Sequence, residues 1–82
     1  MICQYQTTLT GLCPVDDSND VYDVTFESYS MIPVEDILTA MRSYNGFQQF
    51  QEQTTAELAR TLKCRVTTVG FHSGVKTTVS AP

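Results

Sequence analysis

The sequence predicts an α+β domain in which four antiparallel strands form one sheet and two helices cover one of its faces. In four segments apolar and polar residues alternate with a period of two, which is typical of half-buried strands. Between the second and the third of these segments, apolar residues recur at helical spacing over two stretches. The predicted order is therefore β-β-α-α-β-β, and the two hairpins that flank the helices are expected to share a single sheet.

The first hairpin is predicted from the alternation on either side of a polar loop. Residues 2–9 alternate and predict a strand that Gly11 ends. Residues 13–20 contain one proline and five turn-favouring residues, which is typical of a loop. Residues 21–28 alternate again, so we expect a second strand with one buried and one solvated face.

Two helices are predicted next. Pro33 precedes a run with two early acidic residues, which is typical of a helix start, and Asn45-Gly46 is typical of a helix end. The first helix is expected to bury one face, formed by Val34, Ile37, Leu38 and Met41. The second helix is predicted over residues 47–62, with one side formed by Phe47, Phe50, Thr54, Leu58 and Leu62.

The remaining residues predict a second hairpin and complete a single domain, residues 1–82. Residues 64–71 and 75–79 alternate as strands do, and Ser73-Gly74 marks the turn between them. A chain of 82 residues buries only about 60–65% of the surface that its unfolded form exposes, so its own core is marginal. Because a four-stranded sheet also leaves two open edges, we expect identical subunits to pair edge to edge in a closed ring.

The composition is that of a globular protein, with 41% hydrophobic and 17% charged residues. The mean hydropathy of -0.14 and the absence of a long apolar run predict no transmembrane helix and no membrane partner. The first residues lack the basic region and the apolar core of a signal peptide, so we expect a cytoplasmic location.

Charge is distributed unevenly along the chain, whose formal net charge is -4. Residues 1–40 hold seven acidic residues and no Lys or Arg, whereas residues 41–82 hold all five basic residues and two acidic ones. The pI near 4.6 argues against non-specific nucleic-acid binding, which needs a basic surface. It leaves room for a small basic patch from Arg42, Arg60, Lys63, Arg65 and Lys76.

Cys13 is the candidate nucleophile among three cysteines. Cys3, Cys13 and Cys64 predict no disulfide framework, because the number is odd and no CxxC spacing occurs, and the single histidine argues against a zinc site. Cys13 opens the predicted loop, and Asp20 stands seven residues later, where the chain re-enters a strand. If the ends of the loop approach, the thiol can attack an electrophilic carbon while the carboxyl group moves protons. The alternative is that Cys13 is a small packing residue and Asp20 caps a turn.

Three further residues are weaker candidates. Glu52 lies in the second predicted helix, away from its apolar side, and is either a ligand-binding group or a solvated helix residue. Glu35 is equally typical of a first-turn acid that the helix dipole favours. His72 is a candidate base or a turn residue, and Ser73 beside it belongs to no hydrolase motif. The scattered glycines form no phosphate-binding loop.

Three segments together resemble the nitrile reductases of queuosine biosynthesis, the QueF family. Leu12–Val15 (Leu-Cys-Pro-Val) followed by Asp20 is similar to the family signature Leu-Cys-Pro-x-Thr-Gly-Gln-Pro-Asp, with the same interval. Phe50–Gln53 (Phe-Gln-Glu-Gln) resembles the family's Phe-His-Glu helix, and Cys64–Val75 resembles its closing hairpin. The resemblance spans about residues 7–79. It implies the tunnelling fold (T-fold), whose members assemble into rings with sites between subunits.

The resemblance also implies roles for individual residues. In the family a cysteine attacks the nitrile of 7-cyano-7-deazaguanine and forms a thioimide, an aspartate donates a proton, and a helix glutamate holds the amino-pyrimidine edge of the base. Carried over, these residues are Cys13, Asp20 and Glu52. Glu35 and His72 are added as further candidate substrate-binding residues.

The chain departs from the reductases where they bind NADPH, which they do through a Glu-Ser-Lys-Ser-Leu-Lys stretch. By its spacing from the cysteine, Glu35 is the first residue of that stretch, but Asp36–Thr39 follow it without a lysine. No lysine occurs before Lys63, and Gln51 replaces the histidine beside the helix glutamate. These departures predict that the thioimide step is kept while the hydride-donor site is lost.

This pattern resembles the QueF-like amidinotransferases, a branch that lacks the NADPH site. They use ammonia to convert the nitrile of a cyano-deazaguanine nucleotide in a nucleic acid into an amidine, which gives an archaeosine-type base. We therefore expect this reaction, with no bound cofactor, ammonia as co-substrate, and tRNA or DNA carrying the base. The acidic pI counts against a polynucleotide, which would rest on the basic residues of the second half. Alternatives are an NADPH-dependent nitrile reductase, a non-enzymatic acidic binding or inhibitor protein, and a pterin-handling relative.

Overall fold

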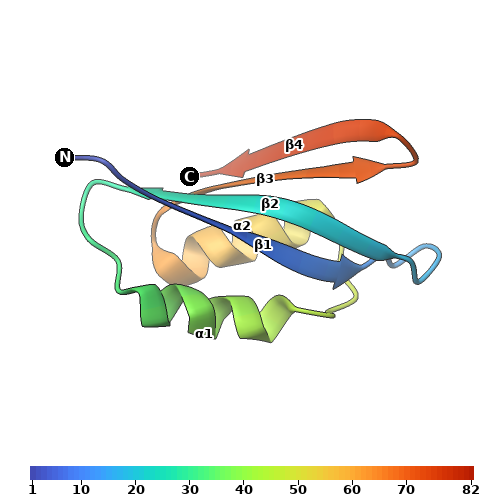
Figure 1. The fold of residues 1–82 in the computed structure, drawn as a ribbon, viewed down its shortest axis with the longest axis horizontal. Coiled ribbons are helices and arrows are strands. Elements are labelled where there is room, and N and C mark those ends of the chain that lie inside the picture. Colours follow the sequence, from blue (N-terminus) through green and yellow to red (C-terminus); the bar gives the residue numbers. More distant parts are fainter.

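The structure, a computed structural model, describes residues 1–82. The chain forms six elements, which are β1 (Cys3–Leu12), β2 (Asn19–Ser28), α1 (Val34–Tyr44), α2 (Gln51–Leu62), β3 (Arg65–His72) and β4 (Val75–Ala81). The strands form one antiparallel sheet in the order β1-β2-β3-β4, and both helices lie on one side of it (Figure 1). The predicted fold class and element order are confirmed. No helix of the protein combines the length and the apolar character that crossing a membrane requires.

The core lies between the sheet and the helices and is thin. Alternate residues of each inner strand point towards the helices, as the period-two pattern predicts. Only 19 of the 82 residues are buried, which agrees with the marginal core expected for a chain of this length. The buried apolar residues are Leu9, Tyr22, Val24, Phe26, Ile32, Ile37, Ala40, Met41, Leu58, Ala59, Cys64 and Val66.

The buried face of α1 differs from the predicted one. Ile37 and Met41 are buried as expected, but Val34 is 53% and Leu38 is 46% exposed, and Ala40 is buried instead. The buried stripe keeps the i, i+3, i+4 spacing of a helix that packs on one side. It begins at Ile37 rather than at Val34, so the helix is rotated relative to the prediction.

The first strand is longer than predicted. Gly11 does not end β1 but pairs with Asp20 inside the ladder, and the last pair joins Leu12 to Asn19. The predicted loop therefore shortens to residues 13–18. As a result Cys13 directly follows one strand, and Asp20 is the second residue of the next strand.

The second helix starts later than predicted, at Gln51 and not at residue 47. Residues 47–50 run extended beside the end of β1, where the Leu12 N–H donates to Phe47 O at 3.1 Å and the Gln49 N–H donates to Leu12 O at 3.3 Å. These bonds occupy backbone groups that a helix would need. Phe47 and Phe50, predicted for the buried side, are consequently 51% and 52% exposed.

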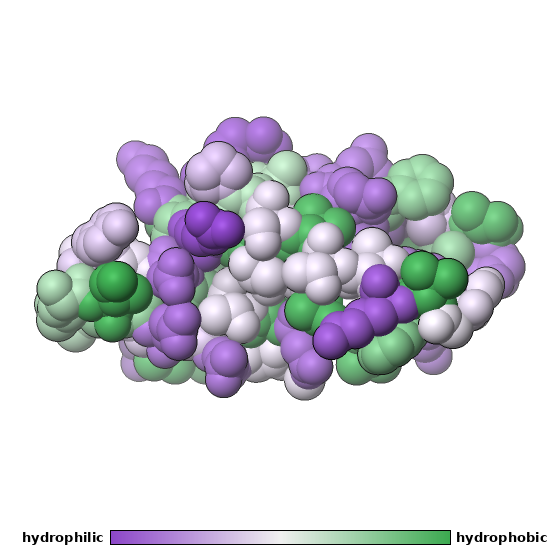
Figure 2. Space-filling model, turned by 90° about the horizontal axis from the view of Figure 1, so that it is seen from above, coloured by the Kyte–Doolittle hydropathy of each residue, from purple (hydrophilic) through white to green (hydrophobic).

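The face of the sheet without helices is polar. Gln6, Thr25, Thr67 and Ser80 form one row across the four strands. Within it Gln6 Nε2 donates to Thr25 Oγ1 at 3.5 Å, and the Thr67 and Ser80 hydroxyls lie 2.9 Å apart. Seen from the side on which β4 lies in Figure 1, pale and hydrophilic residues dominate the middle, and the largest hydrophobic groups lie towards the two ends (Figure 2). β1 and β4 are both edge strands, so the expected edge-paired ring stays a prediction.

Candidate functional site

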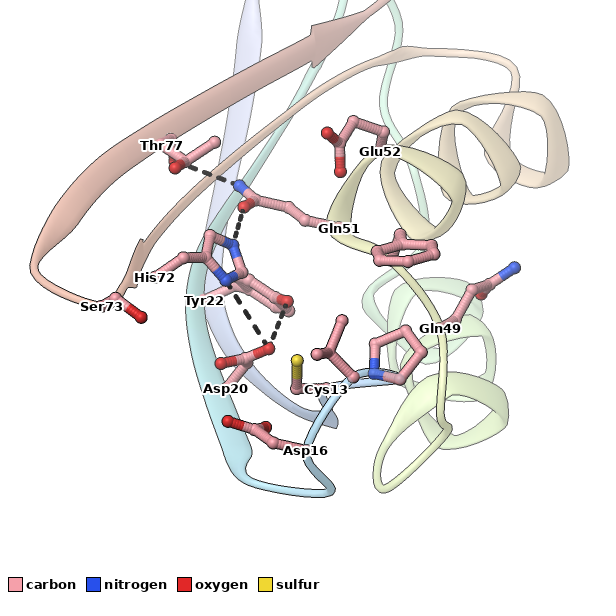
Figure 3. Close-up of a pocket in the computed structure, with 13 residues that line it drawn as sticks. Cys13, Asp16, Asp20, Tyr22, Gln49, Gln51, Glu52, His72, Ser73 and Thr77 are labelled. Atoms are coloured by element: carbon pink, nitrogen blue, oxygen red, sulfur yellow. Dashed lines mark hydrogen bonds and ion pairs between the residues drawn. The ribbon is translucent and has the colours of Figure 1, made fainter.

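A pocket of about 370 Å³ lies at the end of the sheet where the β1–β2 loop, the start of α2 and the β3–β4 turn meet (Figure 3). This size is in the usual range for small-molecule sites. Its lining residues are Cys13, Pro14, Val15, Asp16, Asp20, Tyr22, Gln49, Phe50, Gln51, Glu52, His72, Ser73 and Thr77.

The structure places four of the five predicted site residues on this pocket, which are Cys13, Asp20, Glu52 and His72. Glu35 does not line it. Glu35 lies in the first turn of α1, and no residue of α1 lines the pocket. Within one chain Glu35 is therefore not brought together with the other four residues, and its role in substrate binding stays a prediction.

The backbone around Cys13 is fixed on both sides. The Cys13 N–H donates to Ser18 O at 2.8 Å, and Cys13 O accepts from the Asp17 N–H at 3.0 Å. Gln48 Nε2 donates to the same carbonyl at 3.5 Å and to the Asp17 carboxyl group. Asp17 has a φ of 61°, a left-handed conformation that Asp tolerates better than most residues. The loop therefore holds the thiol in a defined position at the pocket.

Gln51 is the most highly connected side chain of the site and is only 2% exposed. Its Nε2 donates to Thr68 O at 3.2 Å, to Thr68 Oγ1 at 3.0 Å and to Thr77 O at 3.1 Å. Its Oε1 lies 2.8 Å from His72 Nε2. A buried amide is stable only when its polar atoms are paired, and here they all are. Gln51 thus ties the start of α2 to both strands of the second hairpin.

His72 reaches the pocket because of the turn that follows it. Ser73 and Gly74 have φ values of 50° and 83°, which is the pattern of a two-residue type I′ hairpin turn. Strand pairing therefore continues to the His72–Val75 pair, and the imidazole projects over the start of β2. There His72 Nδ1 lies 3.8 Å from Asp20 Oδ2.

Tyr22 supports Asp20 from the same strand. The Tyr22 hydroxyl donates to Asp20 Oδ2 at 3.3 Å. Burial, and then the neighbouring Asp20 carboxyl group, raise the pKa of Tyr22 above its usual value, so the phenol stays a neutral donor. The ring lies over Gly70, where an added Cβ would come within 2.5 Å of it. Gly70 is therefore needed for the position of Tyr22.

The pocket is acidic. Three carboxyl groups line it, from Asp16, Asp20 and Glu52, and its lining contains no Lys or Arg. The Ser18 hydroxyl and amide donate to Asp16 Oδ1 at 2.7 and 3.0 Å and, with a smaller effect of the Cys13 thiol, lower the pKa of Asp16. No group of three or more His, Cys, Asp or Glu is arranged to hold a metal ion.

This arrangement can perform nucleophilic addition with proton transfer. A thiol on a fixed backbone, a nearly buried carboxyl group and an imidazole border one cavity. A thiol and an acid of this kind suit attack on an electrophilic carbon whose heteroatom must gain a proton. The acidic wall also favours a ligand that presents N–H donors or positive charge.

Sequence reasoning missed two residues of the site. Tyr22 was expected only as a residue of the buried strand face, and Gln51 only as a departure from the family motif. The burial of Gln51 could not be predicted from the sequence, because a helix that starts at residue 47 would place a different set of residues on its inner face. A start at residue 51 would have placed Gln51, Thr55 and Leu58 together on that face, by the i, i+4, i+7 spacing.

Comparison with known proteins identifies the fold class. No protein-family model matches the sequence, and no curated protein is significantly similar to it. One solved structure with the tunnelling fold matches this chain over most of its length. The match confirms the fold expected from the resemblance. That protein is the archaeosine synthase QueF-Like in its apo form, with a TM-score of 0.88 and 21% sequence identity. The similarity covers 98% of this chain and 90% of that chain.

Proposed function

We propose that the protein is an amidinotransferase of the QueF-like type. It would convert the nitrile of a 7-cyano-7-deazaguanine nucleotide in a nucleic acid into an amidine, through a thioimide on Cys13. The observation that carries this proposal is that Cys13, Asp20 and Glu52, predicted from separate sequence segments, line one pocket. Similarity in fold to an archaeosine synthase over 98% of the chain supports the same reaction class.

The first step forms the thioimide. Cys13 Sγ attacks the nitrile carbon, and a carbon–sulfur bond replaces one π bond of the nitrile. The nitrile nitrogen gains one proton and the thiol loses one, so Asp20 can take the thiol proton and deliver it to nitrogen. Asp20 is 8% exposed and lies at the start of β2, where Tyr22 holds one of its oxygens. This leaves the other carboxyl oxygen for the proton transfer.

The second step releases the product. Ammonia attacks the thioimide carbon, the carbon–sulfur bond breaks, and the thiol regains a proton. The sum of the two steps is the addition of ammonia to a nitrile, in which nothing is oxidised or reduced. Hence the reaction needs no hydride donor, and the absence of Lys and Arg from the pocket lining favours it over an NADPH-dependent reduction.

Glu52 is proposed to hold the base. It lies in the first turn of α2 and lines the pocket on the side away from the β1–β2 loop (Figure 3). A carboxylate pairs well with two adjacent N–H groups, which the amino-pyrimidine edge of a guanine-like base presents. Bound in this way, the base would lie between Glu52 and Cys13 with its nitrile towards the thiol.

The nucleic acid is proposed to extend away from the acidic pocket. Arg60, Lys63 and Arg65 border a second hollow at the opposite end of the molecule. They are three of the five basic residues of the chain and the natural contacts for phosphates. We expect the enzyme to act in the cytoplasm as a homo-oligomeric ring. Twelve large hydrophobic side chains are exposed on a single chain, which is consistent with further burial between subunits.

The proposal is tested by following the fate of the nitrile. The protein is incubated with [15N]ammonium and NADPH, and with either the free base or an oligonucleotide that contains 7-cyano-7-deazaguanine. We expect 15N to enter an amidine product without oxidation of NADPH, with the oligonucleotide as the better substrate. NADPH consumption with an amine product would instead identify a reductase. No product from either substrate would favour a non-enzymatic protein. The Cys3→Ala variant is the matched control, because Cys3 lies at the start of β1, outside the pocket.

A further inference from the structure

The orientation of the Gln51 side chain determines which nitrogen of His72 carries a proton. Gln51 Nε2 lies 3.2 Å from Thr68 O and 3.1 Å from Thr77 O, and backbone carbonyls only accept hydrogen bonds. The amide nitrogen must therefore face the strands, and Oε1 must face His72. Because Oε1 also only accepts, the 2.8 Å contact requires a proton on His72 Nε2.

This tautomer has a consequence at the other ring nitrogen. In neutral His72 with a proton on Nε2, Nδ1 is an unprotonated acceptor, and it lies 3.8 Å from Asp20 Oδ2. This distance is longer than a hydrogen bond, so Nδ1 is an acceptor that can take up a further proton. A proton on Nδ1 would face the Asp20 carboxyl group, and a nearby negative charge favours the charged form of the ring. The Asp20–His72 pair can therefore receive one proton.

The residues around Asp20 and His72 show which side chain of the pocket can carry a positive charge. Cys13 and Asp16 face the pair from the β1–β2 loop, Tyr22 from β2, and Glu52 from α2. None of these groups is a cation, and the second hairpin contributes no other titratable side chain to the pocket. His72 is thus the only side chain of the site that can become positively charged. Its side chain is 37% exposed, so a proton can reach it from solvent or from a small bound ligand.

We propose that His72 is a positioning residue and that the Asp20–His72 pair holds the proton that ammonium must lose before it attacks; this inference rests on the proposed function. Ammonium gives one proton to the pair and becomes the nucleophile ammonia. Ammonia forms the carbon–nitrogen bond, the carbon–sulfur bond breaks, and the amidine leaves as an amidinium with the stored proton. The overall reaction, nitrile plus ammonium to amidinium, is balanced. The 3.8 Å separation would shorten in the bound state, as is common for catalytic contacts that are long in free enzymes.

The protonation of both ring nitrogens can be observed directly, because His72 is the only histidine of the chain. Long-range 1H–15N NMR of [15N]histidine-labelled protein reports the protonation of each ring nitrogen. We expect Nε2 to be protonated, and Nδ1 to lose its proton at a lower pH in Asp20→Asn, because the carboxylate that favours the imidazolium is then missing. The Gln6→Leu control removes a glutamine on the helix-free face of the sheet and should leave both signals unchanged. A proton on Nδ1 with a free Nε2 in neutral His72, or the same pH titration of Nδ1 in wild type and Asp20→Asn, would overturn the proposal.

The use of the stored proton is tested by separating the two chemical steps. In His72→Gln, a thioimide should still form on Cys13. The ammonium-dependent release of the product should slow about 10–100-fold, which is less than the loss of a direct acid or base costs. The pH dependence of this release rate should also change. Equal release rates and equal pH profiles in wild type and His72→Gln would contradict the proposal. If wild type forms no thioimide, the proposed function fails instead, and the NMR result still decides whether His72 Nδ1 can receive a proton beside Asp20.

Discussion

Each end of the sheet has a cysteine beside a hollow, but the charged residues at the two hollows differ in sign. At one end Cys13 is half-buried in a pocket with three carboxyl groups and no Lys or Arg. At the other end Cys64 is buried, and Arg60, Lys63 and Arg65 border a hollow of about 700 Å³. Asp20 and Ser28 mark the two ends along β2 and lie eight residue steps apart, which corresponds to about 26 Å.

The comparison shows that environment and not residue type distinguishes the two cysteines. Cys64 belongs to the apolar core, and burial raises the pKa of its thiol, which lowers its reactivity. Cys13 instead opens a hydrogen-bonded loop beside Asp16 and Asp20. The buried hydrogen-bond network of Gln51, Thr68 and His72 lies at the first end, whereas the basic side chains of the second end border an open hollow. We interpret the first end as the site of the chemistry and the second as the surface proposed to contact the nucleic acid.

The largest expected effect is a difference in activity between variants of Cys13 and Cys64. Cys13→Ala should abolish the conversion of nitrile, because no other thiol lines the pocket. Cys64→Ala should keep the conversion and lower the free energy of unfolding by about 1 kcal/mol, the transfer contribution of a small buried group. Turnover assays and urea denaturation measure the two effects. Conversion by Cys13→Ala at the wild-type rate would remove the distinction.

The second effect concerns two aspartates of β2. Asp20→Asn should slow turnover about 10²–10⁴-fold, because an amide cannot transfer the proton that the nitrile nitrogen requires. Asp23→Asn is the matched control, since Asp23 lies on the same strand and is exposed outside the pocket. Single-turnover rates of both variants provide the measurement. Similar rates for the two would show that the pocket carboxyl group has no special role.

The third effect tests the apolar core with two leucines. Leu58→Ala should lower the free energy of unfolding by about 2–5 kcal/mol, because Leu58 is fully buried and the substitution leaves a cavity. Leu38→Ala should cost about 1 kcal/mol or less, since Leu38 is 46% exposed on α1. Urea denaturation with equal m-values in both variants measures the difference. Equal losses would contradict the packing of the two helices described above.

The smallest effect is the response of the first end, which holds Tyr22, to alkaline pH. The folded-state pKa of Tyr22 is raised above its usual value near 10, so above that pH the unfolded chain loses this proton first. The free energy of unfolding should therefore fall as pH rises above about 10, and less steeply in Tyr22→Phe. Tyr29→Phe is the control, because Tyr29 is 83% exposed. Identical alkaline slopes in wild type and Tyr22→Phe would show that Tyr22 does not carry this linkage.

Much of the fold was predictable because strand alternation records which side of the sheet is buried. Tyr22, Val24 and Phe26 face the core as the alternation predicted. The start of α2 was not predictable, because residues 47–50 pair with Leu12, and a contact over more than thirty residues leaves no local pattern. The same long-range contact determines where Gln51 lies.

The candidate site was predictable to a similar degree. The interval from Cys13 to Asp20 and the motif around Glu52 identified three residues that line one pocket. Glu35 was selected by its spacing from the cysteine, but the direction of α1 carries it away from the pocket. The network of Gln51, His72 and Asp20 joins three elements and depends on side-chain orientation, which spacing in a sequence does not encode.

The most direct test of the central claim is the intact mass of the protein after mixing with 7-cyano-7-deazaguanine in the absence of ammonium. The same measurement is made with an oligonucleotide that contains this base. Without ammonia the thioimide cannot be released, so wild type and Cys64→Ala should gain the mass of the nitrile compound, and Cys13→Ala should not. An adduct that persists in Cys13→Ala, or no adduct on wild type with either form of the base, would contradict the assignment of Cys13 as the nucleophile.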